Sequence, residues 1–160
     1  MLSRVKAAAF ARFPIGDNAL AMSQENVDIL KAGFEAWNAG DMDAVLDLYV
    51  PEAIFRMPED WPEPGPFVGR EAILRQFEQL RETWDADTVE AISDFVDSGD
   101  RVVVRMIWRG SGHGPVADVE LTSIYTIRKG RIIYDEKFWD HGEALEAVGL
   151  SDREWHPDSS

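Results

Sequence analysis

The sequence predicts an α+β fold in which helices pack on a curved antiparallel sheet that encloses a pocket. Apolar residues recur at helical spacing in the first half of the chain, over residues 23–40 and 70–84. From residue 88 onwards the pattern becomes extended and stays so, and short turns at residues 97–100 and 129–130 separate the extended runs. Helices followed by consecutive strands are typical of α+β domains.

Composition excludes several classes of function. The 160 residues carry a formal net charge of -14, and no basic stripe is present, so we expect no nucleic-acid partner. The chain has no cysteine, which excludes disulfides and thiol nucleophiles. His113, His141 and His156 are too scattered for a metal motif, and no apolar run is long enough to cross a membrane. We therefore expect a cytoplasmic protein with no metal, no cofactor and no membrane partner.

The chain divides into three parts. Residues 1–21 are basic and alanine-rich, and a second natural start follows at Met22. Arg12 interrupts the apolar stretch, so a secretory signal is not expected. We interpret residues 1–21 as an appendage or extended start, with a short docking helix as the alternative. Residues 22–150 form the domain, and residues 151–160 form a polar tail.

Two helices are expected at the start of the domain. Ser23 is a good N-cap for the first, and Gly40 suits the left-handed position that ends it. Asp41 then caps a shorter helix, which Pro51 stops. The apolar stripe of the first helix consists of Val27, Leu30, Phe34 and Trp37.

The remaining elements follow from periodicity and turn signals. We expect a short strand at residues 53–57 and a third helix at residues 70–84. The extended half divides into strands at residues 88–96, 101–109, 116–128 and 130–141, followed by a helix at 142–148.

The last strand carries the most unusual pattern. Because alternate side chains of a strand share a face, Asp135, Lys137 and Trp139 point to one side. If that side faces inward, a carboxylate, an amine and an indole lie in one line on the wall of a pocket.

The order of several short motifs resembles the SnoaL-like branch of the nuclear transport factor 2-like superfamily. The matching segments are residues 34–41 (FEAWNAGD), 48–49 (LY), 53–55 (AIF), 69–73 (GREAI), 130–132 (GRI), 139–141 (WDH) and 143–147 (EALEA). The resemblance covers residues 23–150 and implies a cone-shaped fold with an internal cavity. The superfamily includes ketosteroid isomerases, epoxide hydrolases, polyketide cyclases, dehydratases and proteins without catalysis, so the fold does not name the function.

The resemblance also implies which side chains face the cavity. Trp37, Tyr49 and Trp61 are expected at its mouth. The inward positions on the strands are expected to be Phe55, Met57, Arg105, Ile107, Thr122, Ile133, Asp135, Lys137 and Trp139. Such a pocket is mostly apolar with a few convergent polar groups, as small-molecule sites are.

Known catalytic positions of the superfamily are not retained. The positions of the ketosteroid isomerase base, tyrosine and protonated aspartic acid fall on Met57, Gly33 and Thr122, which cannot supply that chemistry. Of the epoxide hydrolase residues, Arg105 matches the arginine, but Lys137 stands where one aspartate is expected. For a polyketide cyclase, Asp135 is the nearest candidate acid/base.

Three interpretations of the polar residues stay open. The protein could bind a small apolar, carbonyl or anionic ligand, with Arg105 and Lys137 receiving its polar group. The alternative is a cofactor-free isomerase, polyketide cyclase, epoxide hydrolase or dehydratase that uses Asp135 and Lys137 for general acid/base catalysis. In the third, Asp135 and Lys137 pair with Arg105 and only stabilise the fold.

An apolar stripe is expected on the outer face of the sheet, and its burial by a second copy predicts a homodimer. The residues assigned to this stripe are Val102, Val104, Met106, Trp108, Val119, Leu121, Tyr125, Ile127, Tyr134 and Phe138.

Overall fold

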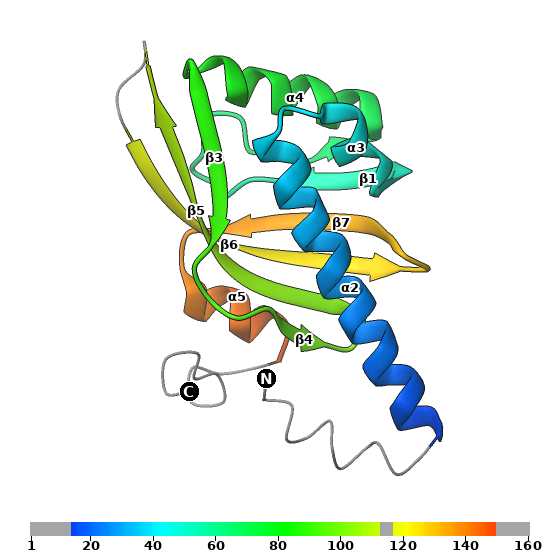
Figure 1. The fold of residues 1–160 in the computed structure, drawn as a ribbon. Helices are drawn as coiled ribbons and strands as arrows, with labels where there is room; N and C mark the ends of the chain where they lie inside the picture. The colour runs from blue at the N-terminus through cyan, green and yellow to red at the C-terminus, as the bar shows by residue number, and fades with distance from the viewer. Residues whose placement is uncertain (1–13, 113–116, 150–160) are drawn as a thin grey trace.

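The computed structural model describes residues 14–112 and 117–149, and it confirms the α+β architecture (Figure 1). The helices are α2 (Pro14–Asn38), α3 (Met42–Asp47), α4 (Arg70–Glu82) and α5 (His141–Ala147). The strands are β1 (Tyr49–Arg56), β2 (Phe67–Val68), β3 (Ala86–Ala91), β4 (Val96–Ser98), β5 (Arg101–Ser111), β6 (Ala117–Arg128) and β7 (Arg131–Phe138).

The strands form one curved sheet with helices on both of its faces. Its order is β2-β1-β7-β6-β5-β3, and β4 also pairs with β5. All neighbours are antiparallel except β1 and β7, which run parallel. In Figure 1, α2 crosses in front of the sheet, α3 and α4 lie beside β1, and α5 lies on the opposite side near β4. The space between the sheet and α2 and α4 holds the core.

The first helix begins earlier than expected. We predicted Ser23 as its N-cap, but α2 already begins at Pro14, so this boundary was wrong. Proline is well tolerated in the first turn of a helix, because the N–H group it lacks would have no partner there. The helix ends at Asn38 and Gly40 follows with a φ of 76°, as predicted.

The second helix is shorter than expected and β1 longer. Asp41 caps α3, its side chain accepting from the backbone N–H of Ala44 at 3.1 Å, as predicted. However, Pro51 does not stop the helix, because β1 already begins at Tyr49. The ladder between β1 and β7 is irregular between Tyr49 and Ile54, so Pro51 lies where strand pairing is interrupted.

One expected strand and the last helix also differ from the prediction. The single strand predicted at residues 88–96 is divided into β3 and β4, which both pair with β5. Between them, the hydroxyl of Ser93 accepts from the backbone N–H of Arg105 at 2.9 Å, which replaces a ladder bond. The last helix was expected at 142–148 but begins one residue earlier, at His141, with Asp140 as its N-cap.

The hairpin between β6 and β7 decides which side chains face the core. Lys129 and Gly130 both have positive φ, 53° and 79°, as a two-residue hairpin turn requires. The register between β6 and β7 shifts by one residue close to this turn. Ile127 pairs with Ile132, but the neighbouring residue of β6, Thr126, pairs with Tyr134. Ile133 is therefore an extra, bulged residue, and every side chain beyond it changes its cross-strand partner.

The predicted apolar outer stripe mostly faces inward. The members of this stripe that belong to the main buried core are Val102, Val104, Met106, Trp108, Leu121, Tyr125 and Ile127. The opposite face contributes Val103 and Ile124 to a smaller cluster with Ala144 and Leu145 of α5. The stripe thus gives no support for a dimer, and the homodimer stays a prediction.

Some expectations fall on residues outside the described part of the chain. These are residues 1–13 of the predicted appendage, the tail at 151–160, and the loop that contains His113. No helix among the described residues has the length and apolar character needed to cross a membrane.

Candidate functional site

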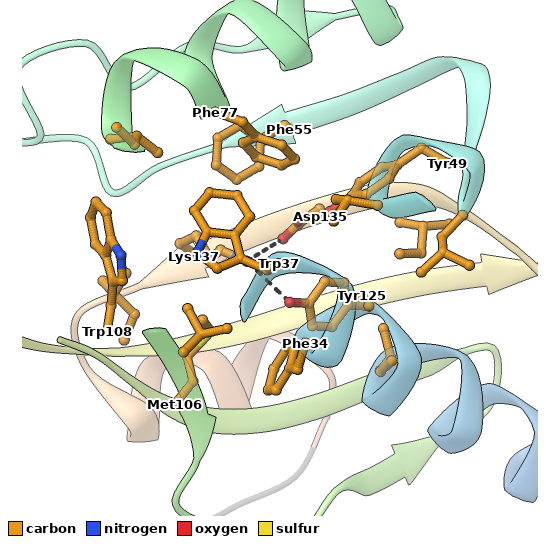
Figure 2. Close-up of a pocket in the computed structure, with 18 of the residues that line it drawn as sticks. Phe34, Trp37, Tyr49, Phe55, Phe77, Met106, Trp108, Tyr125, Asp135 and Lys137 are labelled. Carbon is orange, nitrogen blue, oxygen red and sulfur yellow. Dashed lines mark hydrogen bonds and ion pairs between the residues drawn. The ribbon is translucent and has the colours of Figure 1, made fainter. Parts of the chain in front are cut away.

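A cavity lies between α2, α4 and the inner face of the sheet (Figure 2). The centre of a water-sized sphere can move through about 80 Å³ of it, several times the space that one water needs. Most of the lining is apolar: Leu30, Phe34, Trp37, Val45, Leu48, Phe55, Met57, Phe77, Leu80, Val89, Met106, Trp108, Leu121 and Ile132. The cavity can hold a small organic molecule.

Four polar side chains form a connected network in this apolar wall. The hydroxyl of Tyr49 donates to Oδ2 of Asp135 at 2.6 Å. The ammonium group of Lys137 lies 2.8 Å from Oδ1 of the same carboxylate and 3.3 Å from the hydroxyl of Tyr125. Figure 2 shows the two contacts of Lys137 as dashed lines. Asp135 is 1% exposed and Lys137 9%, so this ion pair is held away from water.

The sheet register brings these groups together. Asp135 is paired with Tyr125 on β6 and with Phe55 on the parallel strand β1, and paired residues share a face. Tyr49 opens β1, where the guanidinium of Arg70 donates to its carbonyl oxygen through Nε at 2.8 Å. The network thus joins β1, β6 and β7.

Burial keeps both tyrosines of the network protonated. It raises the pKa of Tyr49 well above its ordinary value, and the nearby Asp135 carboxylate adds to the effect. Burial also raises the pKa of Tyr125, although the positive charge of Lys137 opposes it. Both hydroxyls are therefore neutral donors near neutral pH.

Lys137 stays charged although it is buried. Desolvation alone would lower its pKa, but the Asp135 carboxylate and the Tyr125 hydroxyl outweigh it and raise the pKa. The ammonium also lies 4.8 Å from the ring centroid of Tyr125 and 5.6 Å from that of Phe55. A protonated amine is not nucleophilic, so the site favours hydrogen bonding by Lys137 over Schiff-base chemistry.

A second carboxylate fixes the aromatic part of the lining. Oδ2 of Asp87 on β3 accepts from the indole N–H of Trp37 and from that of Trp108, both at 2.7 Å. Arg81 of α4 lies 3.6 Å from Oδ1 of Asp87, donates to the carbonyl of Trp37 at 3.0 Å, and lies over the Trp37 ring. The Asp87 side chain is 3% exposed.

The structure brings together only part of the predicted site. The predicted residues that line the cavity are Trp37, Tyr49, Phe55, Met57, Asp135 and Lys137. The prediction that Arg105, Ile107, Thr122, Ile133 and Trp139 line it was wrong, and the same holds for Trp61 at the mouth. The bulge at Ile133 explains the difference for Arg105, Ile107 and Thr122, because it pairs Lys137 with Ser123 rather than with Thr122.

Arg105 belongs to a separate cluster. It donates to the hydroxyl of Thr122 at 3.0 Å and to the carbonyl of Trp139 at 2.8 Å, and it pairs with Glu120 at 3.3 Å. The hydroxyl of Thr122 lies 2.9 Å from Nδ1 of His141. Arg105 therefore pairs with Glu120, and the expected grouping of Arg105 with Asp135 and Lys137 was wrong.

Trp139 lies at the surface. Its side chain is 41% exposed, and its indole N–H donates to Asp60. The ring also packs against Trp61, at 5.6 Å between centroids.

Sequence reasoning missed Tyr125, Met106 and Trp108 of the lining and the role of Asp87. The first three were assigned to the outer face, because without a bulge the two-residue turn pairs Thr122 with Lys137. Asp87 gave no signal in the sequence, since its partners come from α2 and β5.

A comparison with known families matches residues 30–134 to the SnoaL-like domain, which is more than half of the chain. The chain belongs to the SnoaL-like family. The match includes Tyr49 and Tyr125 and ends directly before Asp135, so the ion pair lies just beyond this protein's matched segment. A comparison of this SnoaL-like chain with curated proteins found no match.

Solved structures share the fold of this SnoaL-like protein. A candidate polyketide cyclase from Sinorhizobium meliloti is 28% identical, with a TM-score of 0.59, and the match covers 69% of this chain and 94% of the other. An NTF2-like protein of unknown function from Burkholderia pseudomallei is 18% identical, with a TM-score of 0.65 and coverage of 79% and 98%. A candidate SnoaL-like polyketide cyclase from Jannaschia sp. CCS1 is 20% identical, with a TM-score of 0.62 and coverage of 78% and 92%.

Proposed function

We propose that this SnoaL-like protein binds a small, mostly apolar molecule through one carbonyl oxygen, which Lys137 and Tyr125 hold. The observation that carries the proposal is the buried ammonium group of Lys137 in the wall of an otherwise apolar cavity. Buried charges are costly, and they are common where a ligand must be recognised.

The hydrogen-bonding capacity of the network supports this placement. An ammonium group has three N–H donors, and within the described residues Lys137 uses two of them, toward Asp135 and Tyr125. The hydroxyl of Tyr125 accepts from Lys137 and also lies within reach of the Ser123 hydroxyl, so its own hydrogen can turn toward Ser123 or toward a ligand. An acceptor oxygen near both groups satisfies the third N–H of Lys137 and can receive the hydrogen of Tyr125.

The charge balance favours a neutral oxygen over an anion. Asp135 already compensates the charge of Lys137 at 2.8 Å, and both tyrosines are neutral. An anionic ligand would add an uncompensated charge to a buried site, which is costly. A ketone or aldehyde adds none.

Titration with two probes of similar shape tests the proposal. Acetophenone carries a carbonyl next to an aromatic ring, and ethylbenzene lacks the oxygen. We expect acetophenone to bind about 10-fold to 150-fold more tightly, since one hydrogen bond to a charged donor contributes about 1.5–3 kcal/mol net. Equal affinity of the two probes, measured by calorimetry or NMR titration, contradicts the proposal.

A charge-free variant serves as the matched control. Lys137→Met alone leaves Asp135 buried without its ion partner, and the variant can lose stability for that reason. The double variant Asp135→Leu/Lys137→Met removes both charges together. It should stay folded, bind ethylbenzene as the unchanged protein does, and lose the preference for acetophenone.

The chain of contacts from Tyr49 through Asp135 to Lys137 favours a second candidate, a cofactor-free acid/base enzyme. Asp135 would take a proton from the carbon next to the carbonyl, and Lys137 would stabilise the resulting enolate oxygen. This step is shared by isomerases, polyketide cyclases and some dehydratases. The likeness to a candidate polyketide cyclase, at 28% identity, supports this class.

Hydrogen–deuterium exchange separates the two candidates. In D₂O an enolising enzyme exchanges the methyl protons of acetophenone, which proton NMR follows directly. Faster exchange than in buffer, lost in Asp135→Asn, supports the enzyme. Tight binding with the exchange rate of buffer supports the binding protein.

A further inference from the structure

The aromatic part of the cavity has its own buried anchor. Trp37 comes from α2 and Trp108 from β5, and both line the cavity. Their indole nitrogens both donate to one oxygen of Asp87, at 2.7 Å each. Figure 2 shows Trp108 on one side of the lining and Tyr49 on the other, with Lys137 and Asp135 between them. One carboxylate thus sets the orientation of two large side chains from distant segments.

The anchor is itself held in place. Arg81 lies 3.6 Å from the second oxygen of Asp87 and stacks over Trp37, 5.1 Å from the ring centroid. Next to Trp37, the Asn38 side chain bonds the backbone of Val89 in both directions, at 2.9 and 2.8 Å, which ties the end of α2 to β3. These contacts give the two indoles little freedom to rotate.

The indole N–H groups are not offered to a ligand. An indole has a single donor, and Asp87 takes it from both rings. The two indoles therefore present only aromatic carbon to the cavity. The ring of Phe77 adds to this aromatic surface and lies edge-on to Trp37, with 5.2 Å between the ring centroids. Aromatic faces and edges at fixed angles favour a planar ring over a puckered one of the same size.

We infer that Asp87 is a specificity-determining positioning residue, which orients Trp37 and Trp108 into a wall that selects a flat aromatic ring. With the carbonyl held by Lys137, which rests on the proposed function, the ligand class becomes the aryl ketones and aldehydes. Asp87 does not line the cavity and acts only through the two indoles.

The test compares acetophenone with cyclohexyl methyl ketone, which carries the same carbonyl on a puckered ring. The unchanged protein should prefer acetophenone by about threefold to tenfold, which corresponds to one aromatic pair interaction. In Asp87→Leu the preference should fall to below twofold, and Asp87→Asn, which keeps an acceptor oxygen, should restore part of it. Equal binding of both ketones by the unchanged protein overturns the inference, and so does a preference that survives in Asp87→Leu.

A spectroscopic readout separates positioning from a general loss of stability. The chain has six tryptophans, and the indole N–H signals of Trp37 and Trp108 can be assigned by replacing each with phenylalanine. In Asp87→Asn these two signals should move and exchange faster with solvent, while the others stay in place. Movement of all the signals, or of neither of the two, contradicts the inference.

Glu90→Gln is the matched control. Glu90 lies on the same strand, is 60% exposed, and pairs with Arg109 at 2.6 Å, so its loss of charge should leave the ring preference unchanged. The preference for a flat ring is measured independently of the role of Lys137. The comparison that tests Lys137 uses acetophenone and ethylbenzene, which share the same flat ring. If acetophenone and ethylbenzene bind equally while the planar ring is still preferred, the role of Lys137 fails and that of Asp87 stands.

Discussion

Tyr49 and Asp135 are 86 positions apart in the sequence, yet a 2.6 Å hydrogen bond joins their side chains inside the cavity. The bond connects the first residue of β1 to the middle of β7, and these two strands run parallel. Since the carboxylate is almost fully buried, each donor that it accepts from offsets part of the cost of removing a charge from water.

Replacing Tyr49 with phenylalanine should destabilise the protein. The change removes one donor from a buried carboxylate, and we expect the free energy of unfolding to fall by about 1–3 kcal/mol. Urea denaturation followed by circular dichroism measures it. Tyr134→Phe removes a 3.2 Å bond from the partly exposed Arg56 and should cost less. Equal losses in the two variants contradict a special role of the Tyr49 bond.

Breaking the Asp135–Lys137 pair from one side should cost more than removing both charges. Lys137→Met leaves a buried carboxylate without its cation, for which we expect a loss of about 3–5 kcal/mol. The double variant Asp135→Leu/Lys137→Met should recover most of this loss, because no uncompensated charge remains. A double-mutant cycle from chemical denaturation gives the coupling energy, and additive effects exclude a buried ion pair.

The network should make the stability sensitive to alkaline pH. The pKa values of Tyr49, Tyr125 and Lys137 are all raised in the folded protein. Groups with a raised folded pKa stabilise the fold fully below their unfolded pKa, which is about 10 for both residue types. This contribution is lost as the pH rises through the folded values. Stability from these groups should therefore stay constant between pH 7 and 9 and fall above about pH 10.

Variants at the same positions check the alkaline effect. In Tyr49→Phe the decline above pH 10 should be less steep, because one titrating group is gone. In Tyr134→Phe, at a tyrosine outside the network, the slope should stay as in the unchanged protein. Thermal unfolding across this pH range provides the measurement, and identical slopes in all three proteins argue against the network as the cause.

Gly110 should not tolerate a side chain. A Cβ at this position would lie 2.1 Å from the ring of Trp84, which packs edge-on against Trp108 at 4.6 Å. Gly110→Ala therefore has to displace a buried ring, at a cost of about 1–3 kcal/mol. Adding Trp84→Phe should relieve part of it, since the smaller ring leaves room. If the double variant is less stable than the sum of both changes predicts, the close contact is not the cause.

The homodimer stays a prediction, but the apolar stripe from which it was predicted no longer supports it. The apolar stripe that suggested it belongs mainly to the core, and α5 covers part of the opposite face. Light scattering over a range of concentrations decides the matter. A mass of twice 18.0 kDa supports the dimer, and a constant mass of 18.0 kDa contradicts it.

Local sequence signals determined the elements of this protein. The spacing of apolar residues predicted α4, Gly40 and Asp41 predicted the end of α2 and the start of α3, and the Lys129–Gly130 turn predicted the hairpin between β6 and β7. These features depend on residues close together in the chain, so the sequence carries their signal directly. The alternation of one strand grouped Asp135 with Lys137, and the family resemblance placed both toward the cavity, which they line.

Which other residues join them was decided only by the tertiary structure. One extra residue in β7, Ile133, shifts the register so that Asp135 lies opposite Tyr125. Side chains alternate between the two faces of a strand. A register shift of one residue therefore changes which side chains of β5 and β6 lie on the same face as Asp135 and Lys137. It moves Arg105 and Thr122 to the outer face and brings Met106 and Tyr125 to the cavity. The position of a bulge depends on how the whole sheet curves and packs. The local sequence around Ile133 therefore did not predict it.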